Sequence, residues 1–258
     1  MSDSKPSRMT PQAAAEAFVT PPRPTEVESL APGATSRFVP TPQGKIALHY
    51  LGEGPRVLLL PGWEGQASDM SAFATPLLEA GMQVIAMDLP AHGQSEGTQT
   101  SIPQSAIALK AVGDHIGPLR AVVAHSIGCA VLCEAMHAGL KVSQAVLIGG
   151  PAYFDKYVKA GGRAMGLDEA GVTRMLELLN QRLGISPQEV SVPARATSFT
   201  QPALFIHSDD DQVVPIEDSL INVSAWKGAK HMRVEGLGHR RILRDPAVVA
   251  AALAHVVG

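Results

Sequence analysis

The sequence predicts an α/β protein in which a mostly parallel sheet is covered by helices on both faces. Strand-like and helix-like segments alternate along the chain, which is typical of this class. Several strand-like segments are continuous apolar runs, as expected of strands buried on both faces. With 258 residues, of which 45% are hydrophobic, the chain is long enough for one large domain with a sizeable core.

Residues 1–40 are predicted to form an arm outside the sheet. They are rich in Pro, Ser and Thr, and the run 21–24 (Pro-Pro-Arg-Pro) excludes the interior of a helix or strand. Only Gln12–Phe18 is expected to form a short helix. We interpret the arm as a segment without a catalytic role that is either packed on the surface or partly disordered, or alternatively as part of a homodimer contact. Residues 1–6 precede no apolar run, so no secretory signal is expected.

Residues 41–150 and 201–258 are predicted to form the α/β core. Strands are expected at seven places, namely Ile46–Leu51, Arg56–Leu60, Gln83–Met87, Ala121–Ala124, Ala145–Ile148, Ala203–His207 and His231–Val234. Helices are expected at Ala72–Ala80, from a start at Ser101 that continues through Ala106–Ile116, and, after the N-cap pair Asp245–Pro246, through Val257. Residues 151–200 interrupt this alternation and contain no strand pattern. Within them, Asp168–Leu183 predicts an amphipathic helix whose apolar face carries Val172, Met175, Leu176 and Leu179.

Composition excludes several classes of partner. Lys and Arg total 21 against 24 Asp and Glu, so the net charge of -3 gives no basic surplus for binding nucleic acid. No apolar stretch approaches the length of a membrane span. Cys129 and Cys133 share one face of a predicted helix, where local geometry disfavours a mutual disulfide. Two free thiols suit a reducing compartment, so we expect a cytoplasmic protein.

The stretch Val122–Gly128 predicts a serine nucleophile. An apolar strand runs directly into Ser126, and a helix begins at once on the far side. A serine hydroxyl becomes a useful nucleophile when a sharp strand-to-helix turn places it beside a base and free backbone N–H groups. Such a turn requires small residues two positions before and after the serine, and Ala124 and Gly128 fit. The alternative for Ser126 is simple capping of the helix.

Two further candidates follow later strands, at the edge where open α/β sheets build their sites. The acidic loop 208–215 (Ser-Asp-Asp-Asp-Gln-Val-Val-Pro) leaves one strand, and 235–239 (Glu-Gly-Leu-Gly-His) leaves the next. Among nine histidines, His239 is the preferred base, because the glycines before it make a flexible turn. Within the loop, three consecutive aspartates, of which Asp210 and Asp211 are the candidates, could supply the acid that orients the imidazole.

Four motifs in this order resemble those of the α/β-hydrolase fold serine hydrolases, over about residues 44–258. Residues 58–63 (Leu-Leu-Leu-Pro-Gly-Trp) are similar to the family's His-Gly-x loop, with Pro61 in place of histidine. Residues 86–95 (Ala-Met-Asp-Leu-Pro-Ala-His-Gly-Gln-Ser) are similar to its Asp-x-Pro-Gly-His-Gly-x-Ser turn, with Ala91 in place of glycine. The serine turn, with Ala124 where glycine is usual, and the later Asp and His are the other two motifs.

The resemblance implies an α/β-hydrolase fold, a mostly parallel, doubly covered sheet with a small helical cap. The cap would be residues 151–200, folded as two or three short helices whose apolar face lines an acyl pocket. It also implies a catalytic triad of Ser126, Asp211 and His239. Asp211 fits the family pattern because it stands three residues before a Val-Pro pair, and Asp155 is the third choice of acid, after Asp210. Backbone N–H groups of Ile127 and Trp63 would form the oxyanion hole.

The expected function is hydrolysis of a small-molecule carboxylic ester, or of a thioester or amide, through an acyl-enzyme. No metal or other cofactor is expected, because no metal-ligand or nucleotide motif is present. Hydrolysis of a C–C bond or perhydrolysis by the same triad are alternatives, and so is a non-catalytic member that binds a small molecule. Arg240 and Arg241 are interpreted as solvated charges, with pairing to the acidic loop or to an anionic substrate as the alternatives.

Overall fold

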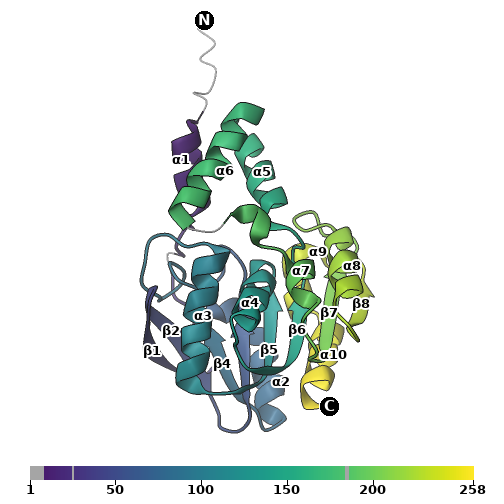
Figure 1. The fold of residues 1–258 in the computed structure, drawn as a ribbon. Coiled ribbons are helices and arrows are strands. Elements are labelled where there is room, and N and C mark those ends of the chain that lie inside the picture. The colour runs from purple at the N-terminus through teal and green to yellow at the C-terminus, as the bar shows by residue number, and fades with distance from the viewer. Residues whose placement is uncertain (1–8, 25, 184–185) are drawn as a thin grey trace, which may run out of the picture.

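The computed structural model describes residues 9–24, 26–183 and 186–258 (Figure 1). One eight-stranded sheet has the order β1-β2-β4-β3-β5-β6-β7-β8. β1 and β2 join it antiparallel, while β4, β3, β5, β6, β7 and β8 run parallel. The strands are β1 (Thr35–Thr41), β2 (Gly44–Leu51), β3 (Arg56–Leu60), β4 (Gln83–Met87), β5 (Leu119–His125), β6 (Val142–Ile148), β7 (Ala203–Ser208) and β8 (Lys230–Val234).

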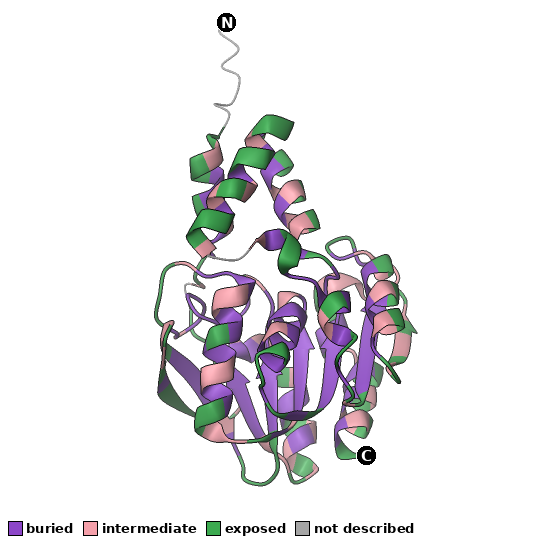
Figure 2. Cartoon of the chain, in the orientation of Figure 1, coloured by how far each residue is buried: buried purple, intermediate pink, exposed green. Residues whose placement is uncertain are grey.

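Helices cover both faces of this sheet, which confirms the predicted fold class. Side chains alternate along the central strands: Leu58 and Leu60 of β3 face one apolar cluster, and Val57 and Leu59 face the other. The first cluster lies under α3 (Ile102–Ile116), α4 (Ile127–His137), α7 (Val192–Ala196) and α8 (Ile216–Ala225). The second lies under the 3-10 helix η1 (Ala67–Phe73), α2 (Ala74–Glu79), the 3-10 helix η3 (Ile242–Arg244) and α10 (Pro246–Val257), and Figure 2 shows the strands between these layers as almost wholly buried.

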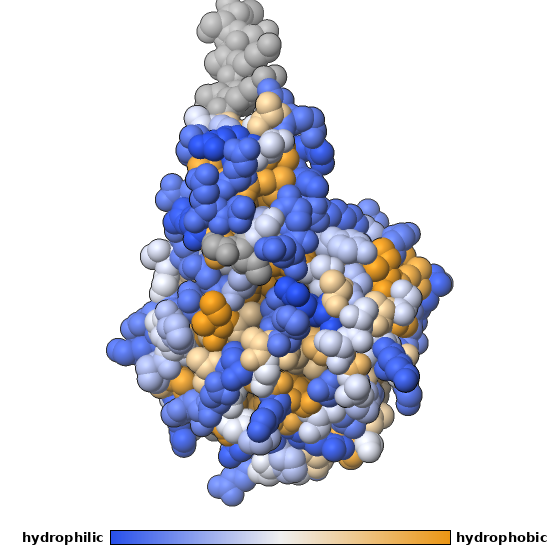
Figure 3. All heavy atoms as spheres, viewed as in Figure 1, coloured by the Kyte–Doolittle hydropathy of each residue, from blue (hydrophilic) through white to orange (hydrophobic). Residues whose placement is uncertain are grey.

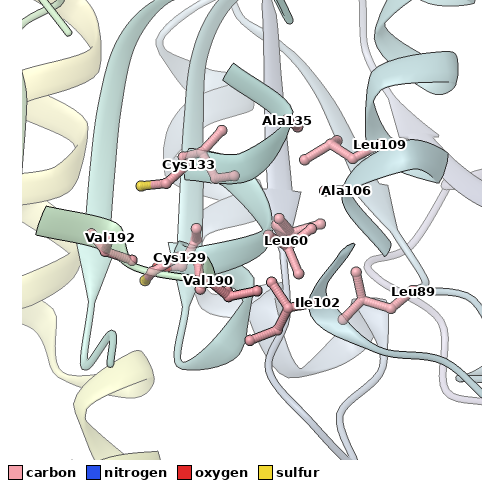
Figure 4. Packing of buried hydrophobic residues seen from close by; sticks show 14 of the residues in the cluster. Leu60, Leu89, Ile102, Ala106, Leu109, Cys129, Cys133, Ala135, Val190 and Val192 are labelled. Carbon is pink, nitrogen blue, oxygen red and sulfur yellow. The ribbon is translucent and has the colours of Figure 1, made fainter. Parts of the chain in front are cut away.

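Both cysteines belong to the first apolar cluster. Cys129 and Cys133 are free and fully buried on α4, beside Leu60 and Val192 (Figure 4). Burial raises the pKa of both thiols. They therefore pack as small apolar side chains, as the sequence predicts.

Residues 151–200 form helices above the end of the sheet that carries the serine turn. They are α5 (Phe154–Ala164), α6 (Glu169–Leu183), the short 3-10 helix η2 (Pro187–Glu189) and α7, while residues 184–185 lie outside the described residues. Figure 1 shows α1 (Pro11–Phe18) standing beside α5 and α6. Apolar side chains lie between these upper helices beneath a largely hydrophilic outer surface (Figure 3).

A buried carboxylate ties this helical segment to the core. Asp218, on α8, is 1% exposed and accepts hydrogen bonds from the backbone N–H of Ala152 (3.0 Å), the Tyr157 hydroxyl (2.6 Å) and Lys156 Nζ (2.7 Å). Burial, together with the bond to Asp218, raises the pKa of Tyr157. The start of the helical segment is thus fixed to α8 by three charge-assisted bonds.

The structure corrects two boundaries. The sheet begins at Thr35, inside the range 1–40 that was predicted to be an arm; residues 1–8 and 25 of that range lie outside the described residues. Helix Ala72–Ala80 is in fact the end of η1 followed by α2, because the seven residues Ala67–Phe73 already turn with 3-10 geometry. No helix in the described ranges is long and apolar enough to cross a membrane.

Candidate active site

The candidate nucleophile stands on a strained turn. β5 ends at His125, Ser126 has φ 54° and ψ -128°, and α4 begins at Ile127. A residue with a side chain rarely adopts positive φ, so the neighbouring structure must hold this conformation. A Cβ atom on Gly62 would lie 2.8 Å from Ser126 Cβ, and one on Gly128 would lie 2.6 Å from the carbonyl oxygen of Pro61. Small residues are therefore required two positions after the serine and on the neighbouring loop that follows β3.

Gly128→Ala is expected to destabilise the protein by about 1–3 kcal/mol, because the obstacles to its Cβ are the backbone carbonyls of Pro61 and Leu60. Guanidinium unfolding of the two proteins would measure the difference. Gly113→Ala, on α3, is the matched control, since its new Cβ would meet only the flexible end of the Leu140 side chain. Equal stability of wild type and Gly128→Ala would contradict the crowding argument.

The structure brings Ser126, His239 and Asp211 into one hydrogen-bonded chain. Ser126 Oγ lies 2.9 Å from His239 Nε2, and His239 Nδ1 lies 2.7 Å from Asp211 Oδ2. Because a carboxylate only accepts hydrogen bonds, Nδ1 carries the imidazole proton and Nε2 is free to accept the proton of Ser126. This arrangement is the geometry that a general base needs.

Asp211 is held in its ionised form. Its Oδ1 accepts hydrogen bonds from the backbone N–H groups of Val213 (2.8 Å) and Val214 (2.9 Å). Burial would by itself raise the pKa of Asp211, but hydrogen bonds from His207 and His239 outweigh it and lower the pKa. The carboxylate is therefore charged at any pH at which the protein would work.

The other carboxylates considered for this position do not contact His239. Asp210 Oδ1 accepts from the backbone N–H of Gly238 (3.0 Å) and from the hydroxyl of Ser208, so it fastens the loop that precedes His239. Asp155 lies on α5 and pairs with Lys159 at 2.6 Å. Of the three candidates, only Asp211 lies within hydrogen-bond distance of the imidazole.

Two backbone N–H groups are the candidates for an oxyanion hole. Ile127 is the first residue of α4, so its N–H has no partner within the helix and lies at the positive end of the helix dipole. Trp63 follows β3 on the neighbouring loop, and both residues line the cavity that contains Ser126.

The Trp63 loop is supported by His92, which the sequence indicated only as a turn residue. His92 Nε2 accepts a hydrogen bond from the backbone N–H of Glu64 (3.3 Å), and its ring packs edge-on against Trp63 with centroids 5.2 Å apart. Burial lowers the pKa of His92, which keeps the ring neutral and able to accept. Asp88 supports the same region by accepting from the backbone N–H of Ala67 (2.7 Å).

His125 holds the backbone of His239, a contact that its place beside the serine in the sequence did not reveal. Its Nε2 donates to the backbone carbonyl of His239 (2.8 Å), and the two rings lie 4.7 Å apart. Burial, and then the charge on His239, lowers the pKa of His125 to about 3. His125 is therefore a neutral donor that fixes the His239 backbone.

Folding stability is expected to fall as the pH is lowered from about 6.5 towards 3. Over this range His125 takes up a proton in the unfolded chain, whereas its buried ring in the folded protein stays neutral. The pKa of His125 is lower in the folded protein than in the unfolded chain. The contribution of His125 to folding stability is therefore complete above the unfolded pKa and is lost progressively as the pH falls towards the folded pKa. The expected slope reaches about 1.4 kcal/mol per pH unit. Chemical unfolding over this pH range should show that the free energy of unfolding depends less steeply on pH in His125→Gln than in wild type. If the free energy of unfolding changed with pH equally in both proteins, His125 would not be the source of the pH dependence.

A largely apolar cavity of about 340 Å³ opens on Ser126. Its walls come from the loops at the end of the sheet, from α5 and α6, and from the N-terminal segment. The lining includes Trp63, Ile127, Phe154, Tyr157, Met165, Leu179, Leu183, Val213 and Val214, with Glu64 as the one charged lining residue in the described part of the chain. In the same ranges, no three His, Cys, Asp or Glu side chains are grouped as a metal site would need.

The arginines after His239 lie outside this cavity. A second cavity of about 270 Å³, on the other side of Trp63, is lined by Arg240, Arg241 and Arg244. Arg240 lies 3.5 Å from Glu64, and Arg241 donates to the carbonyl of Gly236 (2.8 Å). Neither pairs with the acidic loop among the described residues, and both are mainly solvated.

Solved structures share this fold at low sequence identity. An esterase from Exiguobacterium antarcticum superposes with a TM-score of 0.69 at 18% identity, covering 87% of this chain and 100% of that one. A bromoperoxidase from Bacillus anthracis gives 0.65 at 19% identity, covering 86% and 99%. A thioesterase domain from the curacin biosynthetic pathway gives 0.65 at 18% identity, covering 88% and 100%. At these identities the likeness shows the fold alone.

Sequence comparison identifies the family directly. No curated protein matches the chain. The sequence pattern of the alpha/beta hydrolase family matches residues 57–252, which is most of the chain and includes the serine turn, the acidic loop and His239. The resemblance carried by the four motifs is thereby confirmed, and the chain belongs to the alpha/beta hydrolase family.

Proposed function

We propose that this hydrolase cleaves carboxylic esters through an acyl-enzyme on Ser126. The observation that carries the proposal is the hydrogen-bonded chain from Ser126 through His239 to Asp211, which opens on an apolar cavity. A nucleophile, a base and an orienting acid in this geometry are the parts that acyl transfer needs.

In the first half of the reaction, Ser126 Oγ attacks the ester carbonyl carbon while His239 Nε2 takes the hydroxyl proton. Asp211 stabilises the imidazolium that results. The backbone N–H groups of Ile127 and Trp63 donate to the oxyanion of the tetrahedral intermediate. His239 then gives its proton to the oxygen of the departing alcohol, which leaves the acyl group on Ser126.

In the second half, a water molecule attacks the acyl carbonyl carbon and His239 Nε2 accepts its proton. The second tetrahedral intermediate collapses, the bond to Ser126 Oγ breaks, and His239 returns the proton to the serine. The products are a carboxylic acid and the free enzyme. The same steps would cleave a thioester, and in that case a thiol would leave in place of the alcohol.

The lining of the cavity favours an uncharged, apolar acyl group. Glu64 would repel an acid at the mouth, and the remaining walls are mostly aliphatic or aromatic. A volume of about 340 Å³ lies at the lower end of the range for small-molecule sites, so the expected acyl group is small.

Labelling with a fluorophosphonate probe, followed by mass spectrometry, tests this function. We expect an adduct on Ser126 in wild type and none in His239→Ala. His115→Ala is the matched control, because His115 is exposed on α3 and should leave labelling unchanged. A folded wild-type protein that carries no adduct on Ser126, or that carries it equally without His239, would refute the proposal.

A further inference from the structure

The N-terminal segment forms part of the cavity that contains Ser126. α1 packs beside α5 and α6, and Figure 1 shows the three helices together above the end of the sheet. Residues 17–20 and Pro22 line the cavity together with the catalytic serine. Ala14, Ala15 and Val19 are buried against the same helices, so the segment is a fixed wall.

Helix α5 is shaped to receive one side chain of this segment, Phe18. The Phe18 ring lies 5.8 Å from the Phe154 ring, centroid to centroid. A Cβ atom on Gly161 would lie 3.0 Å from Phe18 Cε2 and 3.2 Å from Cδ2. Glycine inside a helix costs about 1 kcal/mol relative to alanine. The absence of a side chain at Gly161 leaves room for the Phe18 ring, which accounts for a glycine at this position in the helix.

Hydrogen bonds attach the segment to the core on its other side. The backbone N–H of Thr100 donates to the carbonyl of Val19 (2.8 Å), and Gln99 Nε2 donates to Thr20 Oγ1 (3.0 Å). Arg23 Nη2 donates to the carbonyl of Ser95 (2.9 Å). The segment is thus held between the helical layer and the loop that follows β4, and Phe18 cannot move away from the cavity without breaking these contacts.

We propose that Phe18 is a specificity-determining residue that limits the length of the acyl group. This inference rests on the proposed function. An acyl group bonded to Ser126 would place its carbonyl beside the N–H of Ile127, and its chain would extend among the other lining residues, which include residues of α1, α5 and α6. Phe18 closes that side with Phe154 and Leu179, and a longer chain would have to enter the volume that its ring occupies.

The test compares kcat/KM for p-nitrophenyl acetate, butanoate, octanoate and dodecanoate. Each methylene that gains a buried site contributes about 0.8 kcal/mol, or roughly fourfold. Phe18→Ala is therefore expected to raise the ratio of octanoate to butanoate at least about tenfold, while leaving acetate nearly unchanged. Phe18→Trp should lower the same ratio. Phe38→Ala is the matched control, because Phe38 is exposed on β1 and does not line the cavity.

An octanoate-to-butanoate ratio that is the same in wild type, Phe18→Ala and Phe18→Trp would overturn the inference. If Phe18→Ala does not fold, Phe18→Leu replaces it with a smaller expected rise in the ratio. A binding readout separates this inference from the proposed function. Calorimetric titration of Ser126→Ala protein with methyl butanoate and methyl octanoate, with and without Phe18→Ala, should show the same change in relative affinity. Ester hydrolysis that fails in wild type while this shift in affinity persists would refute only the proposed function.

Discussion

Replacing Ser126 by alanine is expected to lower kcat for ester hydrolysis by about 10⁶-fold, the loss found when a serine nucleophile of this type is removed. The hydroxyl is the one group of the chain that would form the covalent bond to substrate. Its loss leaves His239 Nε2 without its hydrogen-bond partner, although the N–H groups of Ile127 and Trp63 can still donate to a carbonyl oxygen. The measurement is the rate of p-nitrophenyl ester hydrolysis at saturating substrate, with the fold checked by circular dichroism.

Ser101→Ala is the matched control for this variant. Ser101 lines the same cavity and precedes α3 just as Ser126 precedes α4, but its hydroxyl lies 3.2 Å from Gln104 Oε1 and contacts no histidine. We expect it to keep its activity and to lose about 1 kcal/mol of stability as a helix cap. Turnover that survives Ser126→Ala would show that the reaction does not pass through this serine.

Asp211→Asn is expected to lower kcat by about 10⁴-fold. An amide in place of the carboxylate can turn its NH₂ group towards His239, which would shift the imidazole proton from Nδ1 to Nε2. The tautomer that accepts the serine proton would then be lost, and the imidazolium would have no anion 2.7 Å away. KM should change much less than kcat, because Asp211 lies behind the imidazole.

Asp210→Asn is the neighbouring control. Asparagine keeps an oxygen that can accept from the N–H of Gly238, so the loop before His239 stays in place. The expected effect on kcat is below tenfold. If Asp210→Asn proved more damaging than Asp211→Asn, the roles of the two aspartates would have to be exchanged.

The buried strands were predictable because burial on both faces leaves a plain signal. β3, β4 and β7 each contain four consecutive buried apolar residues, and their predicted bounds differ from the observed ones by at most one residue. β1 gives no such signal, since Val39 alone is buried and Phe38 points to solvent. β1 is an edge strand, and its backbone pairing with β2, rather than burial of its own side chains, holds it in the sheet.

The wall made by α1 was not predictable from local pattern. Ala14, Ala15 and Phe18 are ordinary residues for a short helix, and their partners on α5 and α6 lie far away in the sequence. The spacing of apolar residues indicates which face of a helix is buried, but it does not indicate which distant element covers that face. Of the two expectations for this segment, packed on the surface or partly disordered, the first agrees with residues 11–20, and tertiary contacts, which no local window contains, decide their place.

For the candidate site, motifs led to the residues, and the structure supplied their relations. Ser126, Asp211 and His239 each follow a strand, so their approach to one another follows from a parallel sheet. Three consecutive aspartates left the acid ambiguous, and only distances separate Asp211 from Asp210. The bond from His125 to the His239 carbonyl joins two separate segments and has no signature in either.

The wall formed by α1 has a consequence for how the protein is made. More than half of the chain lies between α1 and α6, which pack against each other, so during synthesis the N-terminal segment emerges long before α6 exists. A helix of eight residues is marginal by itself in water, so α1 is expected to form only when α6 arrives. The wall of the cavity would then close only after β1 to β6, all of which precede α6 in the chain, have been made.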